Sequence, residues 1–141
     1  IFAIDPLQLS SLEIDRRGSD TVMIVHDRGR WDMIEPEPSR ASQIKVLEVL
    51  YEIKDTPVKA FINETPMDLK PYGLDVPRII LTVMEKGKKE PQTLNIGDKD
   101  RTNRGYFAKN KGMQNVVTIE ESLVKKLLAN KDIWKEPEEK T

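Results

Sequence analysis

The sequence predicts an α+β fold: an antiparallel β-sheet of about seven or eight short strands that carries two amphipathic helices. Short runs rich in β-branched and aromatic residues recur along the chain, and turns containing glycine or proline separate them. Two stretches instead repeat apolar residues at helical spacing. The chain has 141 residues, which is enough to bury the core of one domain. We expect that domain to span residues 1–135.

The first half of the domain, residues 7–65, begins with strands. Alternation of apolar and polar residues, with glycine-containing turns in between, predicts three of them, at residues 9–16, 21–25 and 31–34. Trp31 and Met33 share one face of the third strand. A further short strand is predicted near the end of this half, at residues 58–62.

A helix is predicted within this half, over about residues 40–54. Pro36 and Pro38 interrupt the sheet because proline cannot donate a ladder hydrogen bond. Ser39 is then the expected N-cap of the helix. The expected apolar stripe consists of Ile44, Leu47, Leu50 and Tyr51, widened by Val46, Val49 and Ile53.

The second half, residues 78–134, follows a similar pattern. Its predicted strands lie at residues 78–84, 92–96, 106–109 and 115–119. Thr118 and Glu121 form a capping-box pattern, and a helix follows with apolar residues Leu123, Val124, Leu127 and Leu128. Trp134 anchors its end, before a charged tail at residues 136–141. Strands followed by a helix on both sides suggest two pseudo-repeated β-β-β-α halves.

A corner bracketed by Pro71 and Pro77 joins the two halves. Proline fixes its own φ and pushes the preceding residue toward extended geometry, so this segment should be stiff and non-repetitive. Gly73 is the residue there that most easily adopts positive φ. We therefore predict positive φ at Gly73 and a buried side chain at Leu74.

The composition excludes several classes of protein. The chain has 23 basic and 24 acidic residues, a formal net charge of −1, whereas a nucleic-acid-binding domain typically carries a basic face. It contains no cysteine, which excludes disulfides, thiolate catalysis and cysteine metal sites. No apolar run reaches the length of a transmembrane helix. Because the sequence begins at Ile1 and not at a methionine, we expect a longer parent protein with a segment upstream.

Catalytic and metal-binding patterns are weak. His26 is the single histidine, it ends a strand, and no serine nucleophile elbow accompanies it, so we expect a solvated surface residue. The glycines form no phosphate-binding motif, so no cofactor is predicted. Asp98 and Asp100 resemble the start of a calcium loop, but Asn103 stands where the loop needs glycine and Lys109 where it needs an acid.

The polar loop predicted over residues 97–105 offers one candidate binding site. Arg101 and Arg104 lie close to Tyr106 in sequence, and two guanidinium groups beside an aromatic ring suit an anionic polymer or a sugar. The alternative is a hairpin connection in which aspartates cap backbone N–H groups. The sequence leaves both interpretations open.

Several motifs occur together in one order along the chain. They are Asp5-Pro6, Gly29-Arg30-Trp31, Tyr72-Gly73-Leu74-Asp75-x-Pro77, Leu94-x-Ile96-Gly97-Asp98 and Tyr106 before the terminal helix. In this order and spacing, over about residues 1–135, they resemble the bacterial domain of unknown function 4340 family. The matching positions form a turn-and-core signature, so we expect structural roles for Trp31, Tyr72, Gly73, Leu74, Pro77, Gly97 and Asp98.

The resemblance implies a location more than a chemistry, because the family supplies no catalytic residues. Its members look like bacterial proteins with one N-terminal transmembrane segment and one or more such domains outside the cytoplasm, in the periplasm or at the cell surface. Some are encoded near auxiliary components of gliding-motility-type ABC transport systems. We therefore expect a non-enzymatic extracytoplasmic module that binds or scaffolds an envelope protein or polymer. The alternatives are a glycan- or anionic-polymer-binding domain that uses Arg101, Arg104 and Tyr106, and a hydrolase with an unrecognised site.

Overall fold

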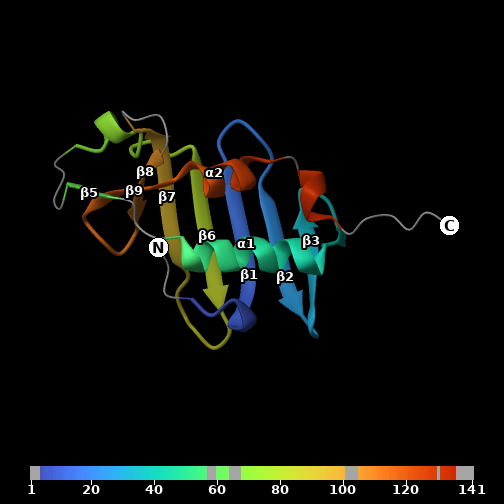
Figure 1. The fold of residues 1–141 in the computed structure, drawn as a ribbon. Coiled ribbons are helices and arrows are strands. Elements are labelled where there is room, and N and C mark those ends of the chain that lie inside the picture. The colour runs from blue at the N-terminus through green and yellow to red at the C-terminus, as the bar shows by residue number, and fades with distance from the viewer. Residues whose placement is uncertain (1–3, 57–59, 64–67, 101–104, 130, 136–141) are drawn as a thin grey trace.

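The computed structural model describes residues 4–56, 60–63, 68–100, 105–129 and 131–135, with the backbone alone at Ala60, Phe61, Asn63 and Lys131. These residues form one antiparallel sheet of nine strands, in the order β4-β3-β2-β1-β6-β7-β8-β9-β5, and two α-helices. Both helices lie on the same side of the sheet (Figure 1). The predicted α+β class is therefore confirmed, with slightly more strands than expected.

The elements of the first half include one strand that sequence patterning missed. In chain order the half contains η1 (Pro6–Gln8), β1 (Leu9–Arg16), β2 (Val22–Asp27), β3 (Arg30–Glu35), β4 (Ser39–Arg40), α1 (Gln43–Asp55) and β5 (Ala60–Asn63). The strand β4 has two residues and follows two prolines, so no alternation of apolar and polar side chains could reveal it.

The second half contains a strand that is longer than predicted. Its elements are η2 (Lys70–Tyr72), β6 (Ile79–Glu85), β7 (Gln92–Lys99), β8 (Gly105–Asn110), β9 (Val116–Glu120), α2 (Glu121–Leu128) and η3 (Lys131–Trp134). Strand β7 continues through Lys99, so Gly97 and Asp98 belong to the sheet and not to a loop.

The two halves meet along the central pair of strands, β1 and β6. These strands are antiparallel, with Ile14 opposite Leu81 and Asp15 opposite Ile80. From this pair, each half continues outward as a series of neighbouring strands and then returns as a helix. Strand β5 crosses to the far edge, where it pairs with β9. The arrangement therefore repeats the strands-then-helix order that the sequence suggested.

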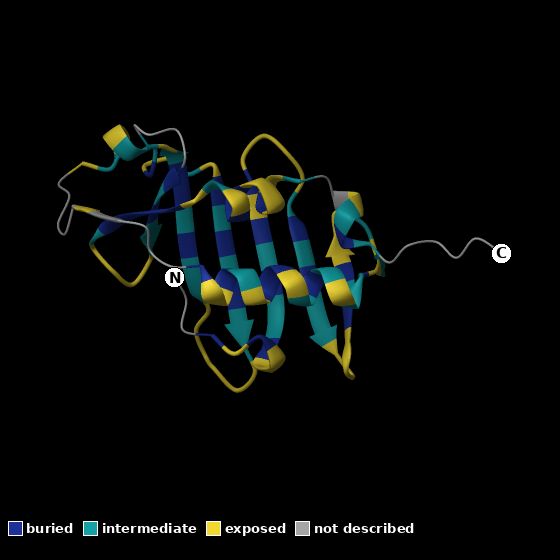
Figure 2. Ribbon diagram, viewed as in Figure 1, coloured by how far each residue is buried: buried dark blue, intermediate teal, exposed yellow. Residues whose placement is uncertain are grey.

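The core lies between the sheet and the two helices. The inward side chains of the central strands are fully buried: Leu12, Ile14, Ile24, Leu81 and Ile96. The helices show the complementary pattern in Figure 2, where their inner sides are buried and their outer sides exposed. Burying each such side chain contributes about 1.5–3 kcal/mol, so these paired layers supply most of the favourable energy of folding.

Helix α1 differs from its prediction in both start and phase. Its N-cap is Ser42, whose Oγ accepts a hydrogen bond from the Lys45 N–H at 3.2 Å, whereas Ser39 lies in β4. The buried stripe consists of Val46, Val49, Leu50 and Ile53. Ile44 is 75% exposed, so the predicted stripe was rotated away from the true one. The helix carries enough apolar residues to fit more than one stripe, and packing on the sheet selects one.

Helix α2 lacks the predicted capping box. The helix starts at Glu121 after Glu120, which makes no side-chain cap hydrogen bond, and Thr118 lies buried in β9. Leu123, Val124 and Leu127 are buried as expected, while Leu128 is 45% exposed. An ion pair between Lys126 and Glu52 joins α2 to α1 on the outer side of the core.

Candidate functional site

Two segments far apart in sequence pack together at one end of the sheet: the corner, residues 70–77, and the Gly97–Asp98 pair of β7. The corner begins with η2, which ends at Gly73 with a φ of 69°, and Leu74 is 3% exposed. Both predictions for the corner are therefore confirmed. Arg78, the residue directly after the corner, donates its N–H to the Ile96 carbonyl at 2.8 Å. This hydrogen bond holds the chain on β7.

Gly97 is required by this packing. A Cβ at position 97 would overlap the Tyr72 carbonyl oxygen and would lie 2.9 Å from the Gly73 carbonyl carbon. Backbone atoms cannot yield as a flexible side chain can, so only glycine lets the corner approach β7 this closely. Gly97 therefore allows the close contact between the corner and β7.

A β-bulge places Asp98 over the corner. Ile96 lies opposite Ala108, but Lys99 lies opposite Tyr106, so β7 has an additional residue at this point. The Asp98 carboxylate lies within 2.6 Å of the position that a Cβ on Gly73 would take. It also accepts a hydrogen bond from Arg78 Nη2 at 3.2 Å. Both side chains of this ion pair are 48% exposed, so its own contribution to stability is small.

Tyr72 extends the corner over the side of the sheet that faces away from the helices. Its ring lies 5.1 Å from the Phe107 ring in an edge-to-face arrangement. Phe107 alternates with Tyr106 and Ala108, which are core residues, so it must point to the opposite side. The corner thus covers one end of this second face of the sheet.

Of the three residues proposed to bind an anionic polymer or sugar, the structure describes only Tyr106. Arg101 and Arg104 lie outside the described residues. Tyr106 is 8% exposed and belongs to the core, with Lys99 Nζ 5.9 Å from its ring centre. Tyr106 therefore has little surface to offer a ligand, and the binding hypothesis stays a prediction that depends on the two arginines.

Trp31 is a core residue whose backbone is held by one amide side chain. It is 3% exposed, and Gln43 accepts a hydrogen bond from its N–H at 2.8 Å and donates to its carbonyl at 2.9 Å.

His26 packs on Trp31 with ring centres 4.9 Å apart. His26 is partly exposed, but its Nδ1 is buried and has no hydrogen-bond partner among the described residues, so it is less fully solvated than expected. Pro77 lies partly exposed just before β6.

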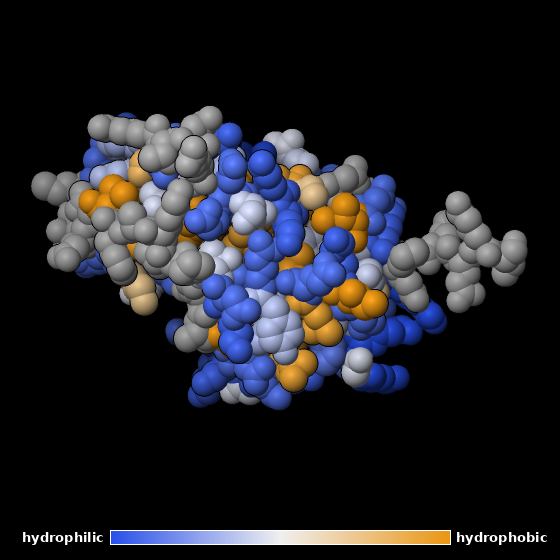
Figure 3. Space-filling view, viewed as in Figure 1, coloured by the Kyte–Doolittle hydropathy of each residue, from blue (hydrophilic) through white to orange (hydrophobic). Residues whose placement is uncertain are grey.

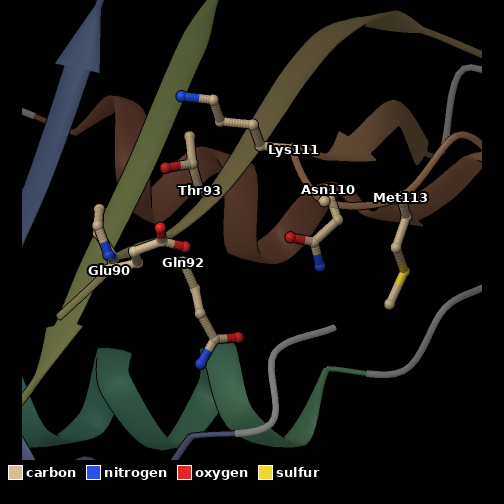
Figure 4. Close-up of a pocket in the computed structure, with 8 residues that line it drawn as sticks. Glu90, Gln92, Thr93, Asn110, Lys111 and Met113 are labelled. Carbon is tan, nitrogen blue, oxygen red and sulfur yellow. The ribbon is translucent and has the colours of Figure 1, made fainter. Parts of the chain in front are cut away.

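A concavity of about 670 Å³ lies between the turns that follow β6 and β8. The residues that line it include Glu90, Gln92, Asn110, Lys111 and Met113. Figure 4 shows Gln92, Asn110 and Met113 extending toward α1, whereas Lys111 points away from it. Its lining mixes polar side chains with Pro91 and Met113, whereas the pockets that hold small molecules are usually lined predominantly by apolar side chains.

The larger candidate is the face of the sheet opposite to α1 and α2, which we call the open face; the corner covers one end of it. Across its centre runs a row of side chains from four neighbouring strands: Met23, Glu13, Thr82 and Thr93. Further apolar side chains flank this row: Val25, Ile80 and Met84. All of these residues are partly exposed, in contrast to the fully buried residues that alternate with them. The open face is therefore mixed in character, with apolar side chains among hydroxyls and carboxylates.

The helix side forms the other large surface of the sheet. Figure 3 shows it as largely hydrophilic, with separate apolar patches. Its exposed large apolar side chains include Ile44, Tyr51 and Leu128, each on a helix. Scattered apolar residues of this kind are normal on a protein surface. The open face is accordingly the stronger candidate for a docking surface.

Lys135 is the ionisable group outside the core with the clearest electrostatic contacts. Lys135 donates to Glu37, and its ammonium lies 3.2 Å from Asp132. These two contacts, that with Glu37 first, raise the pKa of Lys135 above its ordinary value of 10.5. Within the described residues, no group of three or more histidine, cysteine, aspartate or glutamate side chains is placed to hold a metal ion.

Sequence patterning missed one buried charge. Arg16 is 4% exposed, and its guanidinium donates to the Asp20 carbonyl at 2.8 Å and to the Ala129 carbonyl at the end of α2. It alternates with Leu12 and Ile14 on the inner face of β1, which was the available signal. A buried guanidinium at a helix C-terminus satisfies carbonyl groups that the helix itself leaves without a partner.

None of the helices in the described parts of the chain is long and apolar enough to span a bilayer. Neither a curated protein nor a solved structure matches the chain. The family model described as Domain of unknown function (DUF4340) matches residues 31–139, a range that includes the corner, the bulge and both helices. The chain therefore belongs to the DUF4340 family.

Proposed function

We propose that this chain is a non-enzymatic binding or scaffolding module of the bacterial cell envelope, and that its open face docks a partner protein. The observation that carries the proposal is the contrast between the two faces of one sheet. One face is filled by α1 and α2, while the other leaves Val25 of β2 and Ile80 and Met84 of β6 partly exposed, on either side of β1. Apolar side chains interspersed with polar ones are typical of the more polar protein interaction surfaces.

The extracytoplasmic location and the membrane-anchored parent protein belong to the same proposal. They are supported by the family resemblance, which also favours a partner among transport or gliding-type components. A chain without cysteine needs no disulfide and has no thiol to oxidise in that compartment. The closest competing proposal, binding of a glycan or anionic polymer, depends on Arg101 and Arg104.

Site-specific photo-crosslinking tests the docking surface. A crosslinking amino acid would be introduced at Val25 or Ile80 on the open face, and at Ile44 on α1 as a matched exposed control. In envelope preparations, we expect the two open-face positions to capture the same defined protein and the control position to capture none of it. Equal capture from Ile44, or none from either open-face position, would contradict the proposal.

Two further assays separate the competing functions. If the open face is the docking surface, replacing both Arg101 and Arg104 by alanine should leave the crosslinks from Val25 and Ile80 unchanged. Loss of binding to a glycan or polyanion array in that variant would instead favour the second function. Turnover of a substrate in a broad hydrolase screen would contradict the non-enzymatic proposal.

A further inference from the structure

The open face has opposite charges at its two ends. The central row continues on both sides, because Glu35 of β3 lies opposite Met23 and the Lys111 N–H donates to the Thr93 carbonyl at 2.9 Å. The row therefore runs from a carboxylate, through Met23, Glu13, Thr82 and Thr93, to an ammonium group. Both Glu35 and Lys111 are exposed, and neither forms an ion pair with another described residue.

Such a row is complementary to itself. A half-turn about an axis parallel to the strands, placed between β1 and β6, would set a second open face against the first. Strands β1, β2 and β3 of one copy then lie over β6, β7 and β8 of the other, in the order given by the sheet. Glu35 faces Lys111 of the second copy at both ends, and Met23 faces Thr93. Sheets packed in this way lie about 10 Å apart, which brings such side chains into contact.

We infer that the partner docked by the open face is a second copy of this same fold, stacked face to face with Glu35 of each copy paired with Lys111 of the other. The inference rests on the proposed function, because it names an occupant for the surface proposed there. Under the same half-turn, Met84 of one copy lies over Ser11 of the other and Ile80 lies over Asp15, because these residues are opposite each other in the β1–β6 pair. Glu13 lies over the Thr82 hydroxyl of the second copy, which can donate to its carboxylate.

Charge reversal at the two ends tests this pairing. Lys111→Glu and Glu35→Lys would each be examined by sedimentation velocity over a range of concentrations, alongside the unchanged chain. We expect the unchanged chain to dimerise and each variant alone to show a dissociation constant raised about tenfold or more. An equimolar mixture of the two variants should dimerise again, because both end contacts are then restored between unlike charges.

Matched charge reversals on the helix side provide the controls. Glu48→Lys and Lys125→Glu change side chains that are 55% and 71% exposed on α1 and α2. They should leave dimerisation unchanged, and circular dichroism would check that all four variants are folded. A monomeric unchanged chain at every concentration, or a mixture of reversed variants that stays monomeric, overturns the inference. If the open-face crosslinks to a different envelope protein persist in that case, the proposed function stands and only the identity of the partner fails.

Discussion

The Tyr72 carbonyl oxygen lies against the Cα of Gly97, in the space that the Cβ of any larger residue at position 97 would fill. This contact joins the Tyr-Gly-Leu corner to the Ile-Gly-Asp segment of β7. The two most specific pieces of the family motif are therefore two sides of one packing contact. They meet by a close approach of backbone atoms, which explains why each contains a glycine.

Gly97→Ala should destabilise the fold by about 1–3 kcal/mol or more, because the added methyl group meets backbone atoms that cannot rotate away. Urea denaturation would measure the change in the free energy of unfolding. Gly112→Ala is the matched control, since no atom lies within 4 Å of a Cβ at that position and its φ is not positive. A Gly97→Ala variant as stable as Gly112→Ala would contradict the close packing.

Gly73→Ala should combine two separate costs. Its φ of 69° is strained for a residue with a side chain, and its Cβ would meet the Asp98 carboxylate at 2.5–2.6 Å. Gly87 has a similar φ of 79° with nothing within 4 Å, so Gly87→Ala measures the backbone cost alone, about 1 kcal/mol. We expect Gly73→Ala to lose more than Gly87→Ala in thermal denaturation.

The excess loss at Gly73 should depend on Asp98. In the Asp98→Ala background the contact is removed, so Gly73→Ala should cost about the same as Gly87→Ala. A double-mutant cycle that shows no coupling between the two positions would mean that Asp98 moves aside freely. The corner would then be shaped by backbone conformation alone.

Arg16→Met should lower the free energy of unfolding by about 2–3 kcal/mol, because hydrogen bonds from a charged donor are lost and the Ala129 carbonyl is left without one. Arg16→Lys should recover only part of this, since an ammonium lacks the planar fork that reaches both Asp20 and Ala129. Arg17→Met is the control: Arg17 is exposed and donates to the Val76 carbonyl, so it should lose less. Equal losses at the two positions would contradict a special role for the buried guanidinium.

Local patterning predicted the fold class and most of the strands, because alternation of side chains is a property of neighbouring residues. It failed where a long-range contact decides the outcome. Ile44 fits a helical stripe as well as Val46 does, but only Val46 faces the sheet. Likewise Ser39 and Ser42 are equally good N-caps by residue type, and the pairing of Ser39 with Met33 in β4 moves the helix start to Ser42.

In the candidate site, too, some features follow from the local sequence and others depend on tertiary packing. Positive φ at Gly73 follows from residue type and its place between prolines, so it could be predicted. The approach of Gly97 to Tyr72 depends on tertiary packing that no spacing along the chain reveals. The open face also required the structure, because both faces of β6 carry apolar side chains and only the position of the helices distinguishes them.

The C-terminal turn η3 is attached both to the start of α1 and, through Lys135, to the segment before β4. The Ser42 N–H donates to the Trp134 carbonyl at 2.8 Å, and the adjacent Lys135 ammonium contacts Glu37 and Asp132. Because these contacts raise the pKa of Lys135 above 10.5, the folded state holds its proton more tightly than the unfolded state does. The stabilisation is therefore fully present below about pH 10.5 and is lost as the pH rises through the higher folded-state pKa.

Lys135→Met should accordingly lower the melting temperature by a constant amount between neutral pH and about pH 10, and the difference from the unchanged chain should shrink above that range. Thermal denaturation followed by circular dichroism across this pH range measures the difference. About 1 M salt should reduce it at neutral pH, since exposed charges are screened. Lys125→Met, which removes an exposed pair with Glu121 at 3.7 Å, should have a smaller effect. A difference that persists unchanged well above the ordinary lysine pKa would show that packing of the lysine side chain, and not its charge, holds η3 in place.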